Sequence, residues 1–212
     1  MAEMVRHHDE RAVDLYLLVL AQASAGEFDV TFPAAVWVRA LSLDNENGAT
    51  AISKTLARLV AYKLVKRDRV RRRAHITLLC EDGSGEPYTH PGRAKDAYLQ
   101  LPHAYWVQEW HRQLTLPAKA ALLISLSLPR DFFLPIESAR KQFSISSDTL
   151  GEGMRELRRY ELLDQRTITK ADPLTAAGYR TEYWYQLRPP FDQLSSSRSS
   201  HVKTSEKEQK DT

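Results

Sequence analysis

A helical pattern of apolar residues runs through residues 49–65, and the rest of the chain is organised around it. Ile52, Leu56 and Leu59 recur at the i, i+4, i+7 spacing that places side chains on one face of an α-helix. The opposite face of the helical wheel carries small and cationic side chains, namely Ser53, Lys54, Ala57, Arg58 and Ala61. The pattern predicts a helix with one face in a core and the other available to an anionic partner.

A basic stretch follows this helix directly. Seven of the eleven residues from Lys63 to Arg73 are lysine or arginine, and one is acidic. The apolar positions Val65, Val70 and Ile76 predict that this stretch enters a β-hairpin. A helix followed by a basic hairpin is the layout of a winged helix-turn-helix, in which the helix enters the major groove and the hairpin contacts the phosphate backbone.

The same order of patterns recurs about a hundred residues later. Residues 29–43 match residues 131–145 at a constant offset of 102, and residues 52–69 match residues 150–167 at an offset of 98. The change in offset places four extra residues of the first copy in the turn before the helix, where insertions are tolerated. Two copies are too few for a solenoid, so the repeat predicts a duplicated domain.

Flanking patterns supply the other elements of each copy. In the first copy they predict a buried helix over 12–24, a strand over 28–32, a helix from Pro33 to Leu41, and Thr50 as the N-cap of the next helix. In the second copy they predict a short strand over 98–102, a helix-compatible stretch at 104–113, a helix over 118–126 and a hairpin of residues 167–171 and 181–187. The predicted fold class is mainly α with small β-hairpins, that is α+β.

Composition predicts where the domains begin and end. Turn residues and prolines between positions 81 and 93 indicate a linker, so we expect an N-terminal domain over 1–93 and a C-terminal domain over 94–193. Residues 194–212 are mostly polar, which predicts a disordered tail. The apolar runs are too short to span a membrane and the start has no signal-peptide core, so we expect a cytoplasmic protein that does not bind membranes.

Over residues 12–191 the chain resembles tandem winged-helix proteins. The opener at 98–102, the helix start Leu116-Pro117-Ala118-Lys119 and the twice-used helix end Leu-x-x-Tyr-x-Leu-[Val/Leu] are similar to modules of plasmid and phage replication initiators and of transcriptional regulators of bacterial mobile elements. The resemblance implies two winged-helix domains and double-stranded DNA as the partner. It favours a transcriptional regulator; a plasmid-type replication initiator that binds origin repeats and a protein-interaction scaffold are the alternatives.

Within this layout, two sets of residues are expected to contact DNA. The candidates for the major groove are Thr50, Ser53, Lys54, Ala57 and Arg58, and the candidates for the phosphates are Lys66, Arg67, Arg69, Arg71, Arg72 and Arg73. The net charge is only +3, so the local placement of these residues, rather than bulk charge, supports the prediction.

The two copies differ in charge on the helix expected to read DNA. Lys54 corresponds to Glu152 and Arg58 to Glu156, which would reverse the sign of an exposed face at two positions. We therefore expect the first domain to be the main DNA reader and the second to be chiefly a homodimer or partner surface. Secondary DNA or partner contacts are expected from Arg155, Arg158, Arg159, Lys170 and Arg180.

Motifs for catalysis or for cofactors are missing from the sequence. It has no His-Glu-x-x-His motif, no clustered cysteines and histidines, and no glycine-rich phosphate loop, and Cys80 is its one cysteine. We therefore expect no enzyme activity, no catalytic residue, no metal and no cofactor.

Overall fold

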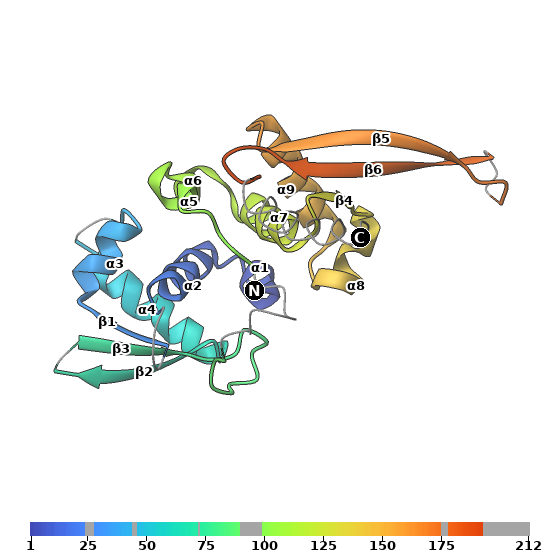
Figure 1. Ribbon diagram of the computed structural model, residues 1–212. Helices are drawn as coiled ribbons and strands as arrows, with labels where there is room; N and C mark the ends of the chain where they lie inside the picture. Colours follow the sequence, from blue (N-terminus) through green and yellow to red (C-terminus); the bar gives the residue numbers. More distant parts are fainter. Residues whose placement is uncertain (24–27, 44–45, 72, 90–98, 175–177, 193–212) are drawn as a thin grey trace, which may run out of the picture. The chain divides into compact units, whose positions relative to one another are not determined.

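The computed structural model describes residues 1–23, 28–43, 46–71, 73–89, 99–174 and 178–192. The chain divides into two compact units, Met1–Asp96 and Ala97–Thr212. Each unit combines helices with a three-stranded antiparallel sheet, so the fold class is α+β (Figure 1). None of the helices within the described residues is long and apolar enough to cross a membrane. The predicted domain boundary at residue 93 and the predicted tail lie outside the described residues.

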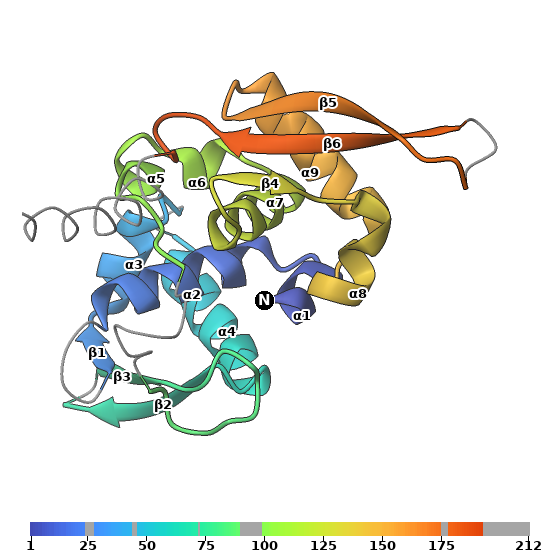
Figure 2. The same cartoon turned by 45° about the vertical axis from the view of Figure 1, so that its right-hand side comes forward.

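Unit 1 has one long helix before its first strand and another before its hairpin. Its elements are α1 (Ala2–Arg6), α2 (Glu10–Gln22), β1 (Asp29–Phe32), α3 (Ala34–Ala40), α4 (Gly48–Ala61), β2 (Val65–Val70) and β3 (Arg73–Leu78). The strand order is β1-β3-β2, so the hairpin strand β3 pairs with both neighbours. Figures 1 and 2 show the long helices on one side of this sheet.

The hydrophobic core of unit 1 lies between these helices and one face of the sheet. Ile52, Leu56 and Leu59 of α4 are each at most 1% exposed, which confirms the apolar face predicted for this helix. Ile76 and Leu78 of β3 are buried on the sheet side. Burial of about five such side chains stabilises the unit by roughly 10 kcal/mol before chain entropy is counted.

Unit 2 repeats this order. Its elements are α5 (Ala104–Val107), α6 (Trp110–Gln113), α7 (Leu116–Ser127), β4 (Asp131–Phe133), the 3-10 helix η1 (Ile136–Ser138), α8 (Ala139–Phe143), α9 (Ser147–Arg159), β5 (Leu163–Ala171) and β6 (Tyr179–Leu187). The strand order β4-β6-β5 corresponds to that of unit 1. Seven residues separate α3 from α4 and three separate α8 from α9, which confirms the position of the four extra residues.

The repeated motif Leu-x-x-Tyr-x-Leu is a helix stop. Lys63 follows α4 with φ 57°, and the amide of Leu64 donates to the carbonyl of Leu59 at 3.1 Å. Glu161 has the same φ after α9, and Leu162 repeats the bond to the leucine five residues earlier at 2.9 Å. This is the Schellman arrangement, in which the residue after the left-handed position donates its amide to the carbonyl five residues earlier. Both long helices therefore pass into their hairpins with the same geometry.

Three local predictions are wrong. Thr50 does not cap α4, because the helix begins at Gly48, where the missing side chain leaves room for Val38. The described residues 99–102 form no strand, and the sheet of unit 2 consists of β4, β6 and β5. The stretch 104–113 is not one helix, because Glu109 has a left-handed φ of 57° and separates α5 from α6.

His111 is buried in unit 2 between aromatic rings. Its ring centroid lies 5.2 Å from that of Trp106 and 6.2 Å from that of Tyr105, and the residue is 6% exposed. Burial lowers the pKa of His111, because the charged form loses its hydration, and the nearby cation Lys119 acts in the same direction. The folded protein therefore holds this histidine neutral at pH values at which the unfolded chain takes up a proton.

The free energy of unfolding is expected to fall as the pH drops below about 6.5, the ordinary pKa of histidine, because only the unfolded state binds the proton there. Denaturant unfolding at pH 7.5 and pH 5 measures this loss. The variant His111→Phe should lose less stability between the two pH values than the wild type does. The exposed His103 supplies the control: His103→Phe should behave as the wild type, and equal losses in all three proteins would contradict the assignment.

Candidate nucleic-acid interface

Four exposed residues follow one side of α4. We call Thr50, Lys54, Ala57 and Ala61 the α4 strip, and all four are exposed because the core contacts on the opposite side of the helix fix its orientation. Lys54 makes no hydrogen bond or ion pair with the residues that the structure describes. Three of the five groove candidates thus lie together on a free surface, with small side chains next to a single cation.

The hairpin borders the α4 strip on one side. The Arg67 guanidinium on β2 donates to the carbonyl oxygen of Ser53 at 3.2 Å and to its hydroxyl oxygen at 3.3 Å. Two candidates from the sequence, one for the groove and one for phosphate, are therefore bonded to each other. This contact holds the hairpin beside the first half of α4.

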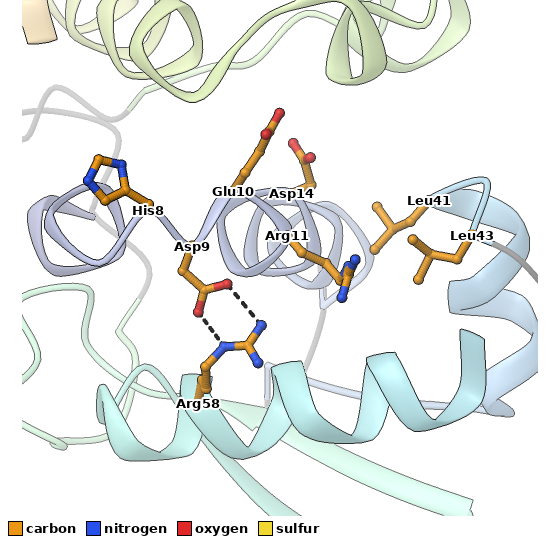
Figure 3. Close-up of a pocket in the computed structure, with 8 residues that line it drawn as sticks. All are labelled: His8, Asp9, Glu10, Arg11, Asp14, Leu41, Leu43 and Arg58. Carbon is orange, nitrogen blue, oxygen red and sulfur yellow. Dashed lines mark hydrogen bonds and ion pairs between the residues drawn. The ribbon is translucent and has the colours of Figure 1, made fainter. Parts of the chain in front are cut away.

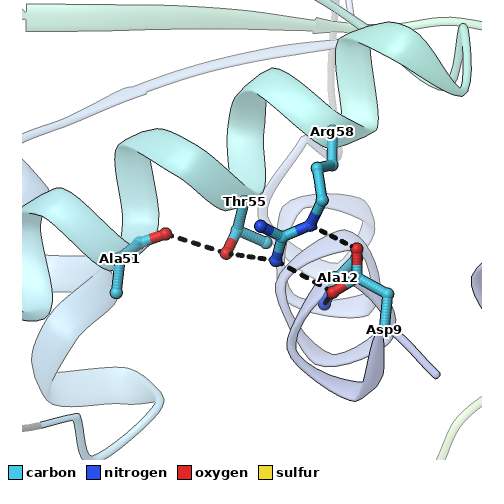
Figure 4. A network of polar contacts seen from close by, with 5 residues as sticks. All are labelled: Asp9, Ala12, Ala51, Thr55 and Arg58. Atoms are coloured by element: carbon cyan, nitrogen blue, oxygen red, sulfur yellow. Dashed lines mark hydrogen bonds and ion pairs between the residues drawn. The ribbon is translucent and has the colours of Figure 1, made fainter. Parts of the chain in front are cut away.

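On the other side of the strip around α4 lies Arg58, which reaches the start of α2 (Figure 4). Arg58 donates through Nη2 to Asp9 Oδ1 at 2.9 Å and to Thr55 Oγ1 at 3.2 Å, and its Nε also bonds Asp9. Asp9 is the N-cap of α2 and also accepts from the amide of Ala12 at 3.3 Å. The bond to Asp9 raises the pKa of Arg58, as expected for a paired guanidinium. Arg58 thus ties α4 to α2 rather than projecting freely from the helix.

A surface pocket lies next to this ion pair (Figure 3). Its volume is about 380 Å³, and it is lined by His8, Asp9, Glu10, Arg11, Asp14, Leu41, Leu43 and Arg58. Three carboxylates, two arginines and one histidine share the lining, so acidic and basic groups nearly cancel and the lining has no strong preference for an anion or a cation. We assign no ligand to it.

The register of the hairpin divides its basic residues between two faces. Arg67 lies opposite the buried Ile76, and Arg69 lies opposite Ala74, so both arginines are on the face that packs against the helices. Lys66 and Arg73 are on the far face, since they occupy the alternate positions of the same ladder. The predicted phosphate contacts therefore do not form one patch.

The far face has mixed charge. Lys66 forms an ion pair with Asp68 at 3.1 Å. His75 lies between Asp29 and Thr31, with Nε2 3.4 Å from the carboxylate and Nδ1 2.8 Å from the hydroxyl. These acidic side chains would oppose phosphate, so the helix side of the hairpin is the better anion-binding face.

The tip of the hairpin presents an arginine in a costly conformation. Arg71 has φ 47°, a region that glycine and asparagine occupy most easily in tight turns. Arg69, Arg71 and Arg73 are exposed and form no hydrogen bond or ion pair among the described residues, whereas Arg72 lies outside them. Positive charge is thus kept at the tip although the turn would be more stable with another residue.

In unit 2, Glu156 is not on the exposed side of α9. It is 9% exposed, and its carboxylate accepts from the Thr115 amide at 2.9 Å and from the Thr115 hydroxyl at 2.5 Å. Thr115 is the N-cap residue of α7, so the contact is equivalent to the one between Arg58 and Asp9. The expected charge reversal at positions 58 and 156 is therefore wrong as a statement about an exposed face: both residues tie two helices together, Arg58 through the carboxylate of Asp9 and Glu156 through the amide and hydroxyl of Thr115.

The remaining exposed side of α9 differs from that of α4. We call Asp148, Glu152, Arg155 and Arg159 the α9 strip; these residues occupy the positions of the α4 strip at an offset of 98 and are all exposed. The reversal from Lys54 to Glu152 therefore does lie on a surface. Arg158, another of the secondary candidates, is also exposed, next to the strip.

The other secondary candidates, Lys170 and Arg180, are paired with an acid on the second hairpin. Lys170 lies 2.7 Å and Arg180 2.8 Å from the carboxylate oxygens of Glu182, which is 4% exposed. Trp184 donates to the same carboxylate at 3.1 Å. The hydrogen bonds from Lys170 and Trp184 lower the pKa of Glu182, so the carboxylate stays charged at neutral pH. Both cations thus share one carboxylate, so the cluster keeps only one net positive charge and offers little to phosphate.

Within the described part of the chain, no group of three or more His, Cys, Asp or Glu side chains could hold a metal ion. Comparisons of the chain with family models, with curated proteins and with solved structures found no match.

Proposed function

We propose that the chain binds double-stranded DNA in a sequence-specific manner through two winged-helix domains, with unit 1 as the reader, and that it acts as a transcriptional regulator. The proposal is supported by the order of elements in each unit: a helix, a strand, a short helix, a long helix and a hairpin. In a winged helix-turn-helix the long helix enters the major groove, and the hairpin lies against the phosphate backbone.

One observation carries the proposal: exposed cations without partners among the described residues lie on the hairpin next to the α4 strip, whose side chains are mostly small. Arg69 lies on the helix side of the hairpin, the side from which Arg67 bonds to Ser53 next to Lys54, and Arg71 lies at the hairpin tip. Ala57 and Ala61 would let the α4 backbone approach base edges, while the cations contact phosphates on either side. The bond between Arg67 and Ser53 holds the two surfaces in register.

The experiment that tests DNA binding is fluorescence anisotropy of the full chain with a random duplex pool over a salt series, followed by selection of bound sequences. The logarithm of the binding constant should fall linearly with the logarithm of salt, with a slope of about −0.9 for each phosphate contacted. A selected site near promoters would support regulation, and repeated sites near an origin would support replication initiation instead. No binding at low salt would refute the proposal and favour a protein-interaction scaffold.

Exchanging charges between the two long helices tests which unit reads DNA. Lys54→Glu places a carboxylate among phosphates and is expected to weaken DNA binding about tenfold or more. The matched variant Glu152→Lys, at the equivalent position of α9, should not weaken binding to a duplex that holds one half-site, since a single copy of unit 1 contacts it. Both affinities come from the same anisotropy titration, and a loss for Glu152→Lys with none for Lys54→Glu would reverse the assignment of the two units.

A further inference from the structure

The charges of the α9 strip are separated by sign. Asp148 and Glu152 occupy the first half of the helix, and Arg155 and Arg159 occupy the second. None of the four forms an ion pair with the residues that the structure describes, although Arg155 donates to the carbonyl of Gly151 at 3.2 Å. All four are exposed and lie within about 60° of one another around the helix. The monomer therefore presents a row of two acids followed by two bases.

The helix dipole accounts for only part of this order. An acid in the first turn and a base in the last turn are favourable, which explains Asp148 and Arg159. The effect is confined to the terminal turns, so it does not favour a particular charge at Glu152 or Arg155 in the middle of α9. The helix dipole therefore does not account for the two central charges.

The spacing of the four charges is symmetric. Asp148 and Arg159 are equally far in sequence from the midpoint between residues 153 and 154, and so are Glu152 and Arg155. A two-fold axis through this midpoint and perpendicular to α9 would place Asp148 opposite Arg159 of a second copy and Glu152 opposite its Arg155. The symmetry doubles these contacts into four complementary pairs. A parallel arrangement would instead oppose like charges.

The adjoining face of the second hairpin suits a protein rather than DNA. On the helix side of β5 and β6 no residue is charged beyond the core positions: the residues are Gln165, Thr167, Thr169, Ala171, Tyr179, Thr181 and Tyr183. Tyr179 is 53% and Tyr183 45% exposed, and Figure 1 shows the hairpin extending well beyond α9. The corresponding face of unit 1 holds Arg67 and Arg69. Tyrosine is enriched in protein interfaces, whereas a face without cations binds phosphate poorly.

We propose that unit 2 binds a second copy of this chain through an antiparallel, two-fold contact between the α9 strips, flanked by the uncharged hairpin faces. Exposed ion pairs are individually weak. Self-association should therefore be modest, should rise with protein concentration and should weaken with salt. The contact is independent of DNA binding by unit 1, and it would give a DNA reader the symmetry that inverted half-sites require.

Sedimentation velocity of the full chain without DNA tests the contact. D148R/E152R makes the strip entirely basic, and R155E/R159E makes it entirely acidic. Each variant alone should self-associate about tenfold or more weakly than the wild type, because like charges then oppose. An equimolar mixture of the two should associate at least as well as the wild type, since every pair is again complementary.

The fourfold variant D148R/E152R/R155E/R159E reverses every charge and preserves the symmetry, so it should dimerise like the wild type. Its dimerisation would show that four charge changes leave α9 folded. Circular dichroism checks the folding of each variant. A wild type that stays monomeric at all accessible concentrations would overturn the proposal, as would a mixture no better than its components. If D148R/E152R instead gains DNA affinity while the wild type is monomeric, the α9 strip is a weak DNA surface and not a dimer contact. Because DNA is absent from the sedimentation experiment, its failure is distinguishable from failure of the DNA-binding proposal.

Discussion

Removing the charges of Arg69 and Arg71 is expected to weaken binding to duplex DNA about a hundredfold at low salt, because two charge-assisted contacts to phosphate are lost. The slope of the logarithmic salt dependence should fall by about 2. Arg69 lies on the helix side of the hairpin, Arg71 is at its tip, and neither has a partner among the described residues. The double variant to alanine should therefore keep its stability while losing affinity.

The far face of the same hairpin supplies a control of equal charge. Lys66→Ala with Arg73→Ala also removes two cations, but Lys66 is already paired with Asp68, and both residues point away from the helices. This control should lose only a few-fold in affinity, as expected for a change in net charge alone. Anisotropy titrations of both double variants over one salt series decide the matter. Equal losses would mean that the overall charge of the hairpin, and not its helix side, attracts DNA.

Gly153→Ala is expected to destabilise unit 2 by about 3 kcal/mol or more, which is a large share of the stability of a domain of this size. A Cβ atom at Gly153 would lie 2.1 Å from the carbonyl oxygen of Pro117 and 2.8 Å from the Cβ of Ala121. The first of these is a backbone atom that no change of rotamer can move. The helices α7 and α9 would have to separate, which would also strain the bonds between Glu156 and Thr115.

Gly151 provides the matched control on the same helix. A Cβ there would meet only the Ile136 side chain at 3.8 Å, which is an ordinary contact. Gly151→Ala should be neutral or stabilise the chain by up to about 1 kcal/mol, since alanine favours the helix. Denaturant unfolding followed by circular dichroism compares the two variants. If Gly153→Ala is as stable as Gly151→Ala, then α7 and α9 do not cross at this glycine.

The periodic patterns of the sequence predicted the elements, because periodicity records which side of an element is buried. The spacing of Ile52, Leu56 and Leu59 identified the buried face of α4, and the repeat identified its counterpart α9. Asp9 was missed, although an aspartate directly before a helix is a recognisable N-cap. Its bond to Arg58, forty-nine residues away, has no local signal in the sequence.

The sequence placed Glu156 on the exposed side of α9, and this prediction was wrong for the same reason: the contact is not local in the chain. A helical wheel gives the angle of a side chain around its own helix, but it does not show which neighbouring helix covers that angle. Arg58 and Glu156 lie at the edge of the polar face, where α2 and α7 approach. Whether such a residue contacts a partner or stabilises the fold depends on the packing of helices and not on local spacing.

By itself, the sequence determined the order of elements, the duplication, and the small and cationic positions on the exposed side of α4, since these follow from local spacing and propensity. Only the tertiary structure decided which charges are available. The pairing of β2 with β3 put Arg67 and Arg69 on one face and Lys66 and Arg73 on the other, and the fold of unit 2 placed Lys170 and Arg180 against Glu182. A charge attracts a partner only if the fold leaves it unpaired and turned outward, and both conditions depend on residues distant in the chain.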